Sequence, residues 1–231
     1  MRRHLTVAVM AALLLSPQVL SPAGAADPAA AAPGFGAGSH PVLFVHGYNG
    51  SAANWDTMAG RFRADGWPAS HLDQWAYDSR QSNATTAERL SVEVDRLLAA
   101  TGASKVDVVT HSMGGLSSRH YAKNLGGDAR IDAWVSLGGP NHGTDWANNC
   151  FDTSCYEMRA GSAFLTALNS GDETPGAPRY ATWWSPCDTI INPDSSVALS
   201  GATNTQTSCL SHNGLLTDAT VYAKVRDTIN R

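Results

Sequence analysis

The stretch VDVVTHSMGGLSSRHYA, residues 106–122, combines an apolar run, one serine and two glycines, and it is the most informative part of the chain for the fold. Its β-branched, apolar start predicts a buried strand over 106–110. Helical spacing follows the glycines, and Gly126-Gly127 predict the end of that helix. Ser112 is therefore expected on a sharp strand-to-helix turn, which exposes a hydroxyl and directs the first N–H groups of the helix toward a bound group.

Strand and helix patterns alternate through the middle of the chain, and most of the strands are apolar throughout. This pattern is typical of a parallel sheet covered by helices on both faces, so we predict an α/β fold with one domain and no large cap. The expected strands are 41–45, 71–77, 106–110, 131–137 and 180–188, with a short strand around Cys209. The expected helices are 52–65, 85–102, the segment after Ser112, and 217–230.

The helix in TTAERLSVEVDRLLAATG, residues 85–102, has apolar residues along one face. We expect it to begin with a capping box of Thr85 and Glu88 and to end at Gly102. Asn83, just before it, stands in an N-glycosylation sequon, which we interpret as a coincidental helix start.

The first 25 residues, MRRHLTVAVMAALLLSPQVLSPAGA, have a basic start, a short apolar core and small residues near the end. This layout is typical of a secretory signal peptide, and the apolar run is shorter than the ~18 residues of a membrane span. We expect cleavage after Ala25, with Ala26 as the close alternative. Residues 26–39 are then a flexible leader, and residues 40–231 form a single domain.

Removing residues 1–25 from the 231 would leave 206 residues, enough for one sizeable core. Without Arg2 and Arg3 the formal charge is 14 − 20 = −6. A mildly acidic chain without a basic run argues against nucleic acid and anionic membranes as partners. We expect a free, extracellular monomer without stable membrane insertion.

The four cysteines lie in the last third of the chain, and an even count behind a signal peptide predicts two disulfides. Three pairings are possible. We favour Cys150–Cys155, which closes a short local loop, together with Cys187–Cys209. A zinc site is the competing interpretation, but the spacing lacks a C-x₂-C pair and the expected compartment is oxidising.

The loop FVHGYNGS, residues 44–51, is the second candidate for chemistry because it is a glycine-rich turn after a strand. Acyl transfer needs two N–H donors at the position where the tetrahedral oxyanion forms. The main-chain N–H groups of Tyr48 and Met113 are our candidates. Thr110 departs from the usual G-x-S-x-G pattern around the serine, and a helix N-cap is the competing interpretation of Ser112.

A serine hydroxyl needs a histidine to accept its proton, and the histidine needs a carboxylate to hold its tautomer. Asp188 directly follows a strand and His212 lies on a later loop, which matches the Ser…Asp…His order of this type of sheet. Asp194 shares a loop with Asp188 and is the rival acid.

Three other histidines receive different interpretations. His142 is the rival base, but its partner by sequence order, Asp132, begins a strand and would lie roughly 15–20 Å from Ser112. His142 is better interpreted as a loop residue at the rim of the pocket. His111 should point away from Ser112 if the strand alternates, and His46 should have a structural role in its loop. The pair Trp183-Trp184 is expected in the core and in the pocket wall.

At this point the chain resembles the small secreted bacterial triacylglycerol lipases of the α/β-hydrolase fold, of the near-minimal type without a lid. The matching segments are VHGYNGSAANW, THSMGG, LGGPNHGT, CDTIINPDSS and SHNGLL, which together span about residues 40–220. The resemblance implies Ser112 as nucleophile, Asp188 as acid and His212 as base, with Tyr48 and Met113 as oxyanion donors. It also implies hydrolysis of lipid esters.

We therefore expect a secreted serine ester hydrolase that cleaves lipid or other small carboxylic esters through an acyl-enzyme intermediate, with no metal and no organic cofactor. A short-chain carboxylesterase or an acyltransferase on the same triad is the alternative. A catalytically dead binding module is a further alternative from a different class, because fold does not fix function. Only residues 140–180 could hold a lid, and they are mostly polar and glycine-rich, so we expect no strong interfacial activation.

Overall fold

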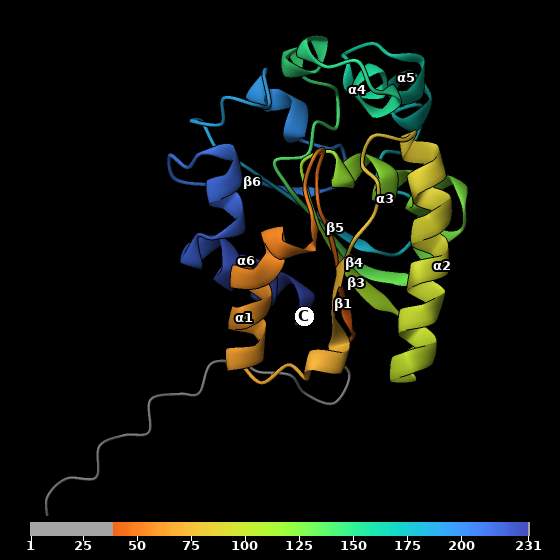
Figure 1. Ribbon diagram of the computed structural model, residues 1–231, viewed down its shortest axis with the longest axis vertical. Helices are drawn as coiled ribbons and strands as arrows, with labels where there is room; N and C mark the ends of the chain where they lie inside the picture. Colours follow the sequence, from red (N-terminus) through yellow and green to blue (C-terminus); the bar gives the residue numbers. More distant parts are fainter. Residues whose placement is uncertain (1–38, 231) are drawn as a thin grey trace, which may run out of the picture. The chain divides into compact units, whose positions relative to one another are not determined.

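A six-stranded parallel sheet with strand order β2-β1-β3-β4-β5-β6 forms the centre of this computed structural model, which describes residues 39–230 (Figure 1). The expected signal peptide, and all but Ser39 of the expected leader, lie outside the described residues. The strands are β1 (Val42–Val45), β2 (Leu72–Trp75), β3 (Val106–His111), β4 (Ile131–Leu137), β5 (Arg179–Trp184) and β6 (Thr203–Gln206). The strand expected around Cys209 is wrong in position, because β6 ends at Gln206 and Cys209 lies in the following turn.

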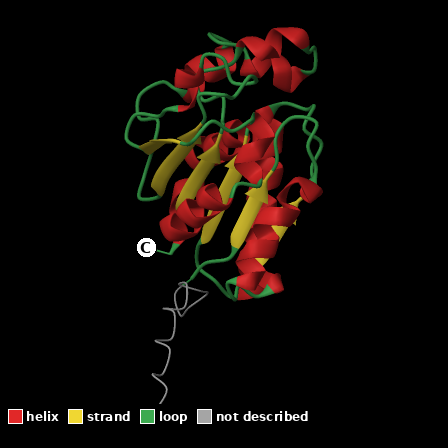
Figure 2. Ribbon diagram, turned by 90° about the vertical axis from the view of Figure 1, so that its left-hand side faces the viewer, coloured by secondary structure: helices red, strands yellow, loops and turns green. Residues whose placement is uncertain are grey.

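Helices cover both faces of the sheet, so the predicted α/β architecture is confirmed (Figure 2). The α-helices are α1 (Asp56–Ala64), α2 (Asn83–Thr101), α3 (Gly114–Asn124), α4 (Thr153–Met158), α5 (Ala163–Leu168) and α6 (Ala219–Ile229). Short 3₁₀ helices are η1 (Ala52–Trp55), η2 (Ala69–His71), η3 (Gly127–Ala129), η4 (Asp145–Asn149), η5 (Asp194–Val197) and η6 (His212–Leu216). None of the helices in the described part of the chain has the length and apolar character needed to cross a membrane.

Alternation along the strands explains the two layers. Successive side chains of a strand point to opposite faces, so an apolar run supplies two cores at once. Phe44 of β1 packs with α1 and α6, whereas its neighbour Leu43 packs with α2 and α3. Val109 and Val108 of β3 divide in the same way.

The start of α2 differs from the prediction. Ser82 is the N-cap and accepts a hydrogen bond from the N–H of Ala84, so the helix begins at Asn83 and not at a capping box of Thr85 and Glu88. Asn83 is fully buried, and its main-chain and side-chain N–H groups both donate to Glu157 of α4, over 2.6 and 2.9 Å. A carboxylate from 74 residues away therefore completes the cap, and no local pattern could indicate it.

The strand order places a crevice beside β1. The chain runs from β1 to β2 on one side and then returns to β3 on the other, and open parallel sheets bind ligands at the carboxyl ends of the strands where such a reversal occurs. The loop after β1 and the turn after β3 meet at this point. In both views α4 and α5 lie beyond this end of the sheet (Figures 1 and 2).

Candidate active site

Ser112 lies on the turn between β3 and α3 with a left-handed backbone, φ 55°. A non-glycine residue in this region is uncommon and costs energy, so it is found mainly where surrounding structure enforces it. Gly114 supplies part of the enforcement, because a Cβ there would lie 2.5 Å from the His46 carbonyl oxygen and 2.6 Å from that of Val45. The first turn of α3 can therefore rest directly on the end of β1.

Thr110 fits at the position where the usual pattern has glycine. Its side chain is buried, and its hydroxyl donates to the main-chain carbonyl of Val135 in β4 over 3.0 Å. Across from it stands Gly115, where a Cβ would lie 3.0 Å from the Ser136 hydroxyl. Glycines stand instead at 114 and 115, where a Cβ would crowd neighbouring atoms.

Asp188 and His212 form a close pair. The Nδ1 of His212 lies 2.7 Å from Oδ2 of Asp188, and the other carboxylate oxygen accepts the N–H groups of Ile190 and Ile191 at 2.8 and 3.1 Å. Burial by itself would raise the pKa of Asp188, but the hydrogen bond and charge of His212 and the two N–H groups hold it below its ordinary value. Asp188 is therefore a buried carboxylate that fixes the Nδ1–H tautomer of His212.

A disulfide joins the loops that carry this pair. Cys187, next to Asp188, is bonded to Cys209, three residues before His212. We call Cys187–Cys209 the long disulfide and Cys150–Cys155 the short disulfide; both are the pairings favoured from the sequence.

His111 does not point away from the site, contrary to the prediction. Its ring lies 4.4 Å from the His212 ring between centroids, and its Nε2 lies 3.1 Å from the His212 carbonyl oxygen. Because a carbonyl only accepts, His111 donates through Nε2. Burial lowers the pKa of His111 to about 3, so the ring is neutral at ordinary pH and supports the loop of His212 without adding charge. The turn at Ser112 breaks the simple alternation that the prediction assumed.

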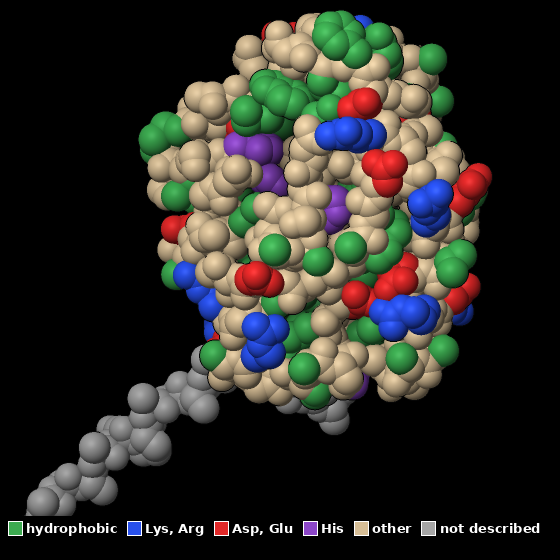
Figure 3. Space-filling model, in the orientation of Figure 1, with side chains coloured by type: hydrophobic (Ala, Val, Ile, Leu, Met, Phe, Trp, Pro, Cys, Tyr) green, Lys and Arg blue, Asp and Glu red, His purple; other side chains and the backbone are tan. Residues whose placement is uncertain are grey.

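A cavity of about 250 Å³ opens between Ser112 and His212. Its apolar lining includes side chains from the segments after β4 and β5: Trp146, Met158, Ile190 and Ile191. The lining also includes polar side chains, among them Asn49, Asn54 and Asn213. On the face drawn in Figure 3, histidine and hydrophobic side chains gather below the region of α4 and α5.

Ser112 and His212 line this cavity without a hydrogen bond between their side chains among the described residues. In enzymes, the hydrogen bond between nucleophile and base often forms fully only when substrate is bound. A nucleophile–base pair is therefore compatible with this arrangement. A lining with both apolar and polar side chains suits a ligand with a hydrocarbon part and a polar, reacting part.

The two candidate oxyanion donors lie on either side of the candidate nucleophile, Ser112. A Cβ at Gly47 would lie 2.6 Å from Cβ of Ser112, so the loop after β1 passes directly over the serine, and Tyr48 is the next residue. Met113 follows Ser112 and is the N-cap residue of α3. Within the part of the chain that the structure describes, neither main-chain N–H donates to another main-chain group. Both remain available to an oxyanion beside Ser112.

The rival base, His142, and the carboxylates Asp132 and Asp194 do not line the cavity. His142 bonds Glu173 through Nε2 at 2.7 Å and does not line the cavity, so its expected place at the rim is wrong; Thr144 lines the cavity instead. Asp132 is paired with Arg179. Asp194 begins η5 and makes no contact with His212 among the described residues.

The sequence also missed most of the cavity wall. Trp183 lies in the core, as expected, but the tryptophan that lines the cavity is Trp146 and not the 183–184 pair. Ile190 and Ile191 stand two and three residues after Asp188, and this apolar pair in an otherwise polar loop was a signal that could have been used. Met158 left no such signal, because it reaches the cavity through the packing of α4.

A model of the family described as lipase (class 2) matches residues 39–229. The chain belongs to the class 2 lipase family. Two relatives named triacylglycerol lipase are similar over part of this chain: one from Burkholderia plantarii, 32% identical over 131 residues, and one from Pseudarthrobacter phenanthrenivorans, 29% identical over 120 residues.

These matches cover 54% and 49% of this chain, and only 36% and 37% of the two relatives. The chain thus matches little more than a third of the length of the curated relatives. Among solved structures, the mature lipase BlEst2 of Bacillus licheniformis superposes with a TM-score of 0.70 at 16% identity, over 90% of this chain and 96% of that one. At that identity the similarity shows the shared fold.

Proposed function

We propose that the protein is a serine ester hydrolase that acts on lipid esters, with Ser112 as nucleophile, His212 as general base and Asp188 as the acid of the triad. The observation that carries the proposal is the shared cavity: a serine with enforced left-handed backbone and a carboxylate-bound histidine both line it. Membership of the class 2 lipase family supports a lipid ester as the substrate class.

The proposed reaction has two halves. Ser112 attacks the acyl carbonyl carbon while His212 accepts the hydroxyl proton, and Asp188 stabilises the imidazolium that forms. The N–H groups of Tyr48 and Met113 bind the oxyanion. His212 then protonates the departing alcohol, and a water molecule deprotonated by the same histidine attacks the acyl-enzyme and releases the acid.

A short-chain carboxylesterase is the second candidate, and the size of the cavity favours it. A volume of about 250 Å³ lies below the roughly 300–1,000 Å³ of common small-molecule pockets. A short acyl chain would fill such a space, whereas a long one would extend over the surface. Rates for p-nitrophenyl esters of increasing chain length separate the two: a maximum at short chains that falls steeply supports the esterase, and sustained rates at long chains support the lipase.

We also propose that the protein is secreted as a monomer. Two disulfides are expected only where the compartment is oxidising, which supports export. The region of α4 and α5 is held to the body by hydrogen bonds with α2 and α3, which supports a cavity without a moving lid. Besides the bonds of Glu157 to the start of α2, the ammonium of Lys123 donates to three carbonyls at and just after the end of α5: Leu168, Ser170 and Asp172.

A fluorophosphonate probe tests the nucleophile. It should label the protein at Ser112, and Ser112→Ala should abolish labelling and lower kcat by at least about 10⁴-fold, because the residual rate comes only from binding and the oxyanion donors. Peptide mapping of the labelled site and rates on p-nitrophenyl butyrate provide the measurement. Hydrolysis that survives in Ser112→Ala would refute the mechanism.

A further inference from the structure

Asp152 has an unusual contact for its position. It is the N-cap residue of α4, where an aspartate ordinarily accepts hydrogen bonds from the N–H groups of the first turn. Its side chain makes no such bond here. Oδ2 of Asp152 instead accepts the phenol hydroxyl of Tyr48 over 2.5 Å, across 104 residues of sequence. Asp218, the N-cap of α6, shows the ordinary arrangement, with its carboxylate 2.9 Å from the N–H of Val221.

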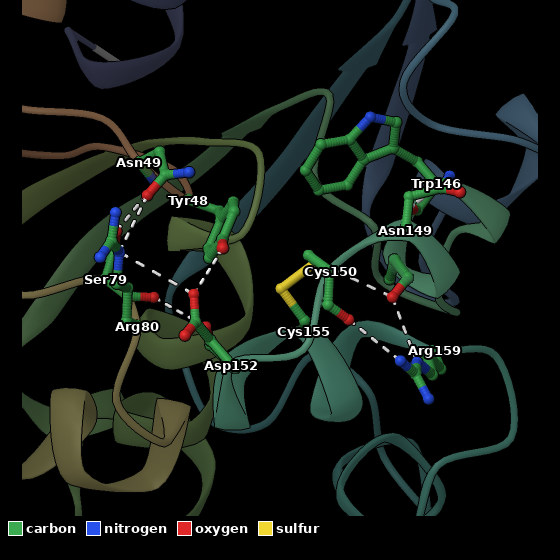
Figure 4. The surroundings of a disulfide bond; sticks show 12 residues. Tyr48, Asn49, Ser79, Arg80, Trp146, Asn149, Cys150, Asp152, Cys155 and Arg159 are labelled. Atoms are coloured by element: carbon green, nitrogen blue, oxygen red, sulfur yellow. Dashed lines mark hydrogen bonds and ion pairs between the residues drawn. A yellow bond between two sulfur atoms is a disulfide. The ribbon is translucent and has the colours of Figure 1, made fainter.

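The contact belongs to a cluster of three chain segments beside Tyr48. We call the side of the cavity with Tyr48 and Met113 the oxyanion side. Nε of Arg80 donates to the side-chain oxygen of Asn49 at 3.2 Å and lies 3.8 Å from Oδ2 of Asp152. Asn49, which follows Tyr48, has a left-handed φ of 53°, and its N–H donates to the Ser79 hydroxyl at 2.9 Å. Residues 48–49, 79–80 and 152 therefore hold each other, and Figure 4 shows the side chains of Tyr48 and Arg80 converging on Asp152.

The short disulfide encloses Asp152. The two cysteines lie two residues before and three residues after it, and both sulfur-bearing residues belong to the apolar cluster against which Tyr48 and Trp146 pack. Met113, the other candidate oxyanion donor, lies in the same cluster. Ser154, within the disulfide loop, donates through its hydroxyl to the Ser79 carbonyl at 2.8 Å. The loop is thus fixed on both sides of Asp152.

We infer that Asp152, fixed by the short disulfide, is a positioning residue for the oxyanion hole: by binding the phenol of Tyr48 it sets the direction of the Tyr48 main-chain N–H. The inference rests on the proposed function. A donor must lie within a few tenths of an ångström of its place to stabilise the transition state, and a displacement near 1 Å can cost as much as about 10²-fold in rate. Loss of the Asp152 contact should therefore lower kcat and leave KM almost unchanged.

The test compares Asp152→Ala and Tyr48→Phe with matched controls. Asp172→Ala removes an exposed carboxylate of the neighbouring segment, and Tyr156→Phe removes an exposed phenol hydroxyl directly after the disulfide loop. Rates on p-nitrophenyl butyrate are expressed per Ser112 site titrated with fluorophosphonate, so that unfolded protein does not count. Each test variant should lose about tenfold in kcat with KM within twofold, and each control should keep kcat within twofold.

Two further readouts distinguish positioning from general stability. The double variant should lose no more than the worse of the two single variants, because both changes break one contact. Affinity for a boronic acid, whose tetrahedral adduct places an oxygen in the oxyanion position, should fall by the same factor as kcat. Replacing both cysteines of the short disulfide with alanine should also lower kcat, as Asp152→Ala and Tyr48→Phe do.

The outcomes separate this inference from the proposed function. If Tyr48→Phe and Asp152→Ala keep the kcat of the wild type, or if their losses add in the double variant, the inference is wrong while the function stands. If the wild type is not labelled at Ser112, or Ser112→Ala retains hydrolysis, the proposed function itself fails. Tyr48→Phe keeps the volume of the side chain, so it provides the decisive measurement even if Asp152→Ala is poorly folded.

Discussion

The two sides of the cavity are cross-linked in different ways. On the oxyanion side, the short disulfide closes a loop with a sequence separation of 5, and Asp152 within it contacts Tyr48. On the acid–base side, the long disulfide has a separation of 22 and joins the loops of Asp188 and His212. The entropy that a cross-link removes from the unfolded chain grows with loop length. The difference suggests that the long disulfide serves mainly stability and the short one mainly position.

Each side also has a buried histidine at the end of a strand. His46, after β1, stacks on Tyr77 with ring centroids 4.1 Å apart, whereas His111, at the end of β3, packs on His212. Burial lowers the pKa of both rings. Only the second of these histidines directly contacts a proposed catalytic side chain. A change of charge should therefore lower activity more on the acid–base side of the cavity than on the oxyanion side.

The largest expected effect comes from removing charge on the acid–base side. Asp188→Asn should lower kcat by about 10³–10⁴-fold with little change in KM, because an amide no longer stabilises the imidazolium of His212. Asp194→Asn should stay within twofold of the wild type. Steady-state kinetics on p-nitrophenyl butyrate measure both, and the reverse ranking would move the acid to Asp194.

Removing the two disulfides one at a time tests the comparison itself. In the chain-entropy model, alanine at both cysteines of the long disulfide should lower the free energy of unfolding by about 3 kcal/mol, and the same change at the short disulfide by about 2 kcal/mol. Urea unfolding at pH 7 gives both values. If loss of the short disulfide destabilises the protein more than loss of the long one, the division between position and stability is wrong.

A smaller effect concerns the pH dependence of stability through His111. The unfolded chain takes up a proton at this ring near pH 6.5 and the folded chain only near pH 3, so the free energy of unfolding falls as the pH decreases through that window. The slope for one proton is about 1.4 kcal/mol per pH unit. His111→Gln lacks this titrating ring, so it should not lose this part of its stability. Between pH 6 and pH 4, its free energy of unfolding should therefore rise relative to that of the wild type, by about the slope given for one proton. Parallel curves for the two proteins would contradict the assignment.

The smallest expected effect is at a lipid interface. With α4 and α5 fixed to the body on both sides, the rate on tributyrin should rise smoothly through the solubility limit, because no lid has to open. The measurement is titration at constant pH over that concentration range. A sharp increase at the emulsion point would show that part of residues 140–180 moves, and that the oxyanion side is less rigid than its contacts indicate.

Much of the fold followed from short-range patterns. The β-branched run before Ser112 predicted β3, the glycines after it predicted the turn, and the alternation of strands and helices predicted the parallel sheet. These features depend on residue types within a few positions of each other, where steric and hydrogen-bonding preferences act directly. Less was predictable where a distant group replaced a local one, as at the start of α2, where Glu157 acts in place of Glu88.

The candidate site divides in the same way. The order Ser112, Asp188, His212 could be predicted because Ser112 and Asp188 were expected directly after strands and His212 on a later loop. A parallel sheet brings such loops together at one edge. The structure places Asp188 and His212 2.7 Å apart; their catalytic roles remain predictions. The apolar wall was missed because its residues come from irregular loops whose side-chain directions have no periodicity.

By itself, the sequence determined the type of sheet, the place of the nucleophile candidate on its turn, and the residue types of the triad, since these depend on local preferences. Only the tertiary structure decided that His111 packs on His212, 101 residues away, and that Asp152 leaves its own helix uncapped to bind Tyr48. Such contacts depend on which surfaces meet when the chain closes on itself. A side chain with a local partner and a distant one takes whichever the packing brings closer, and that choice is made by the whole fold.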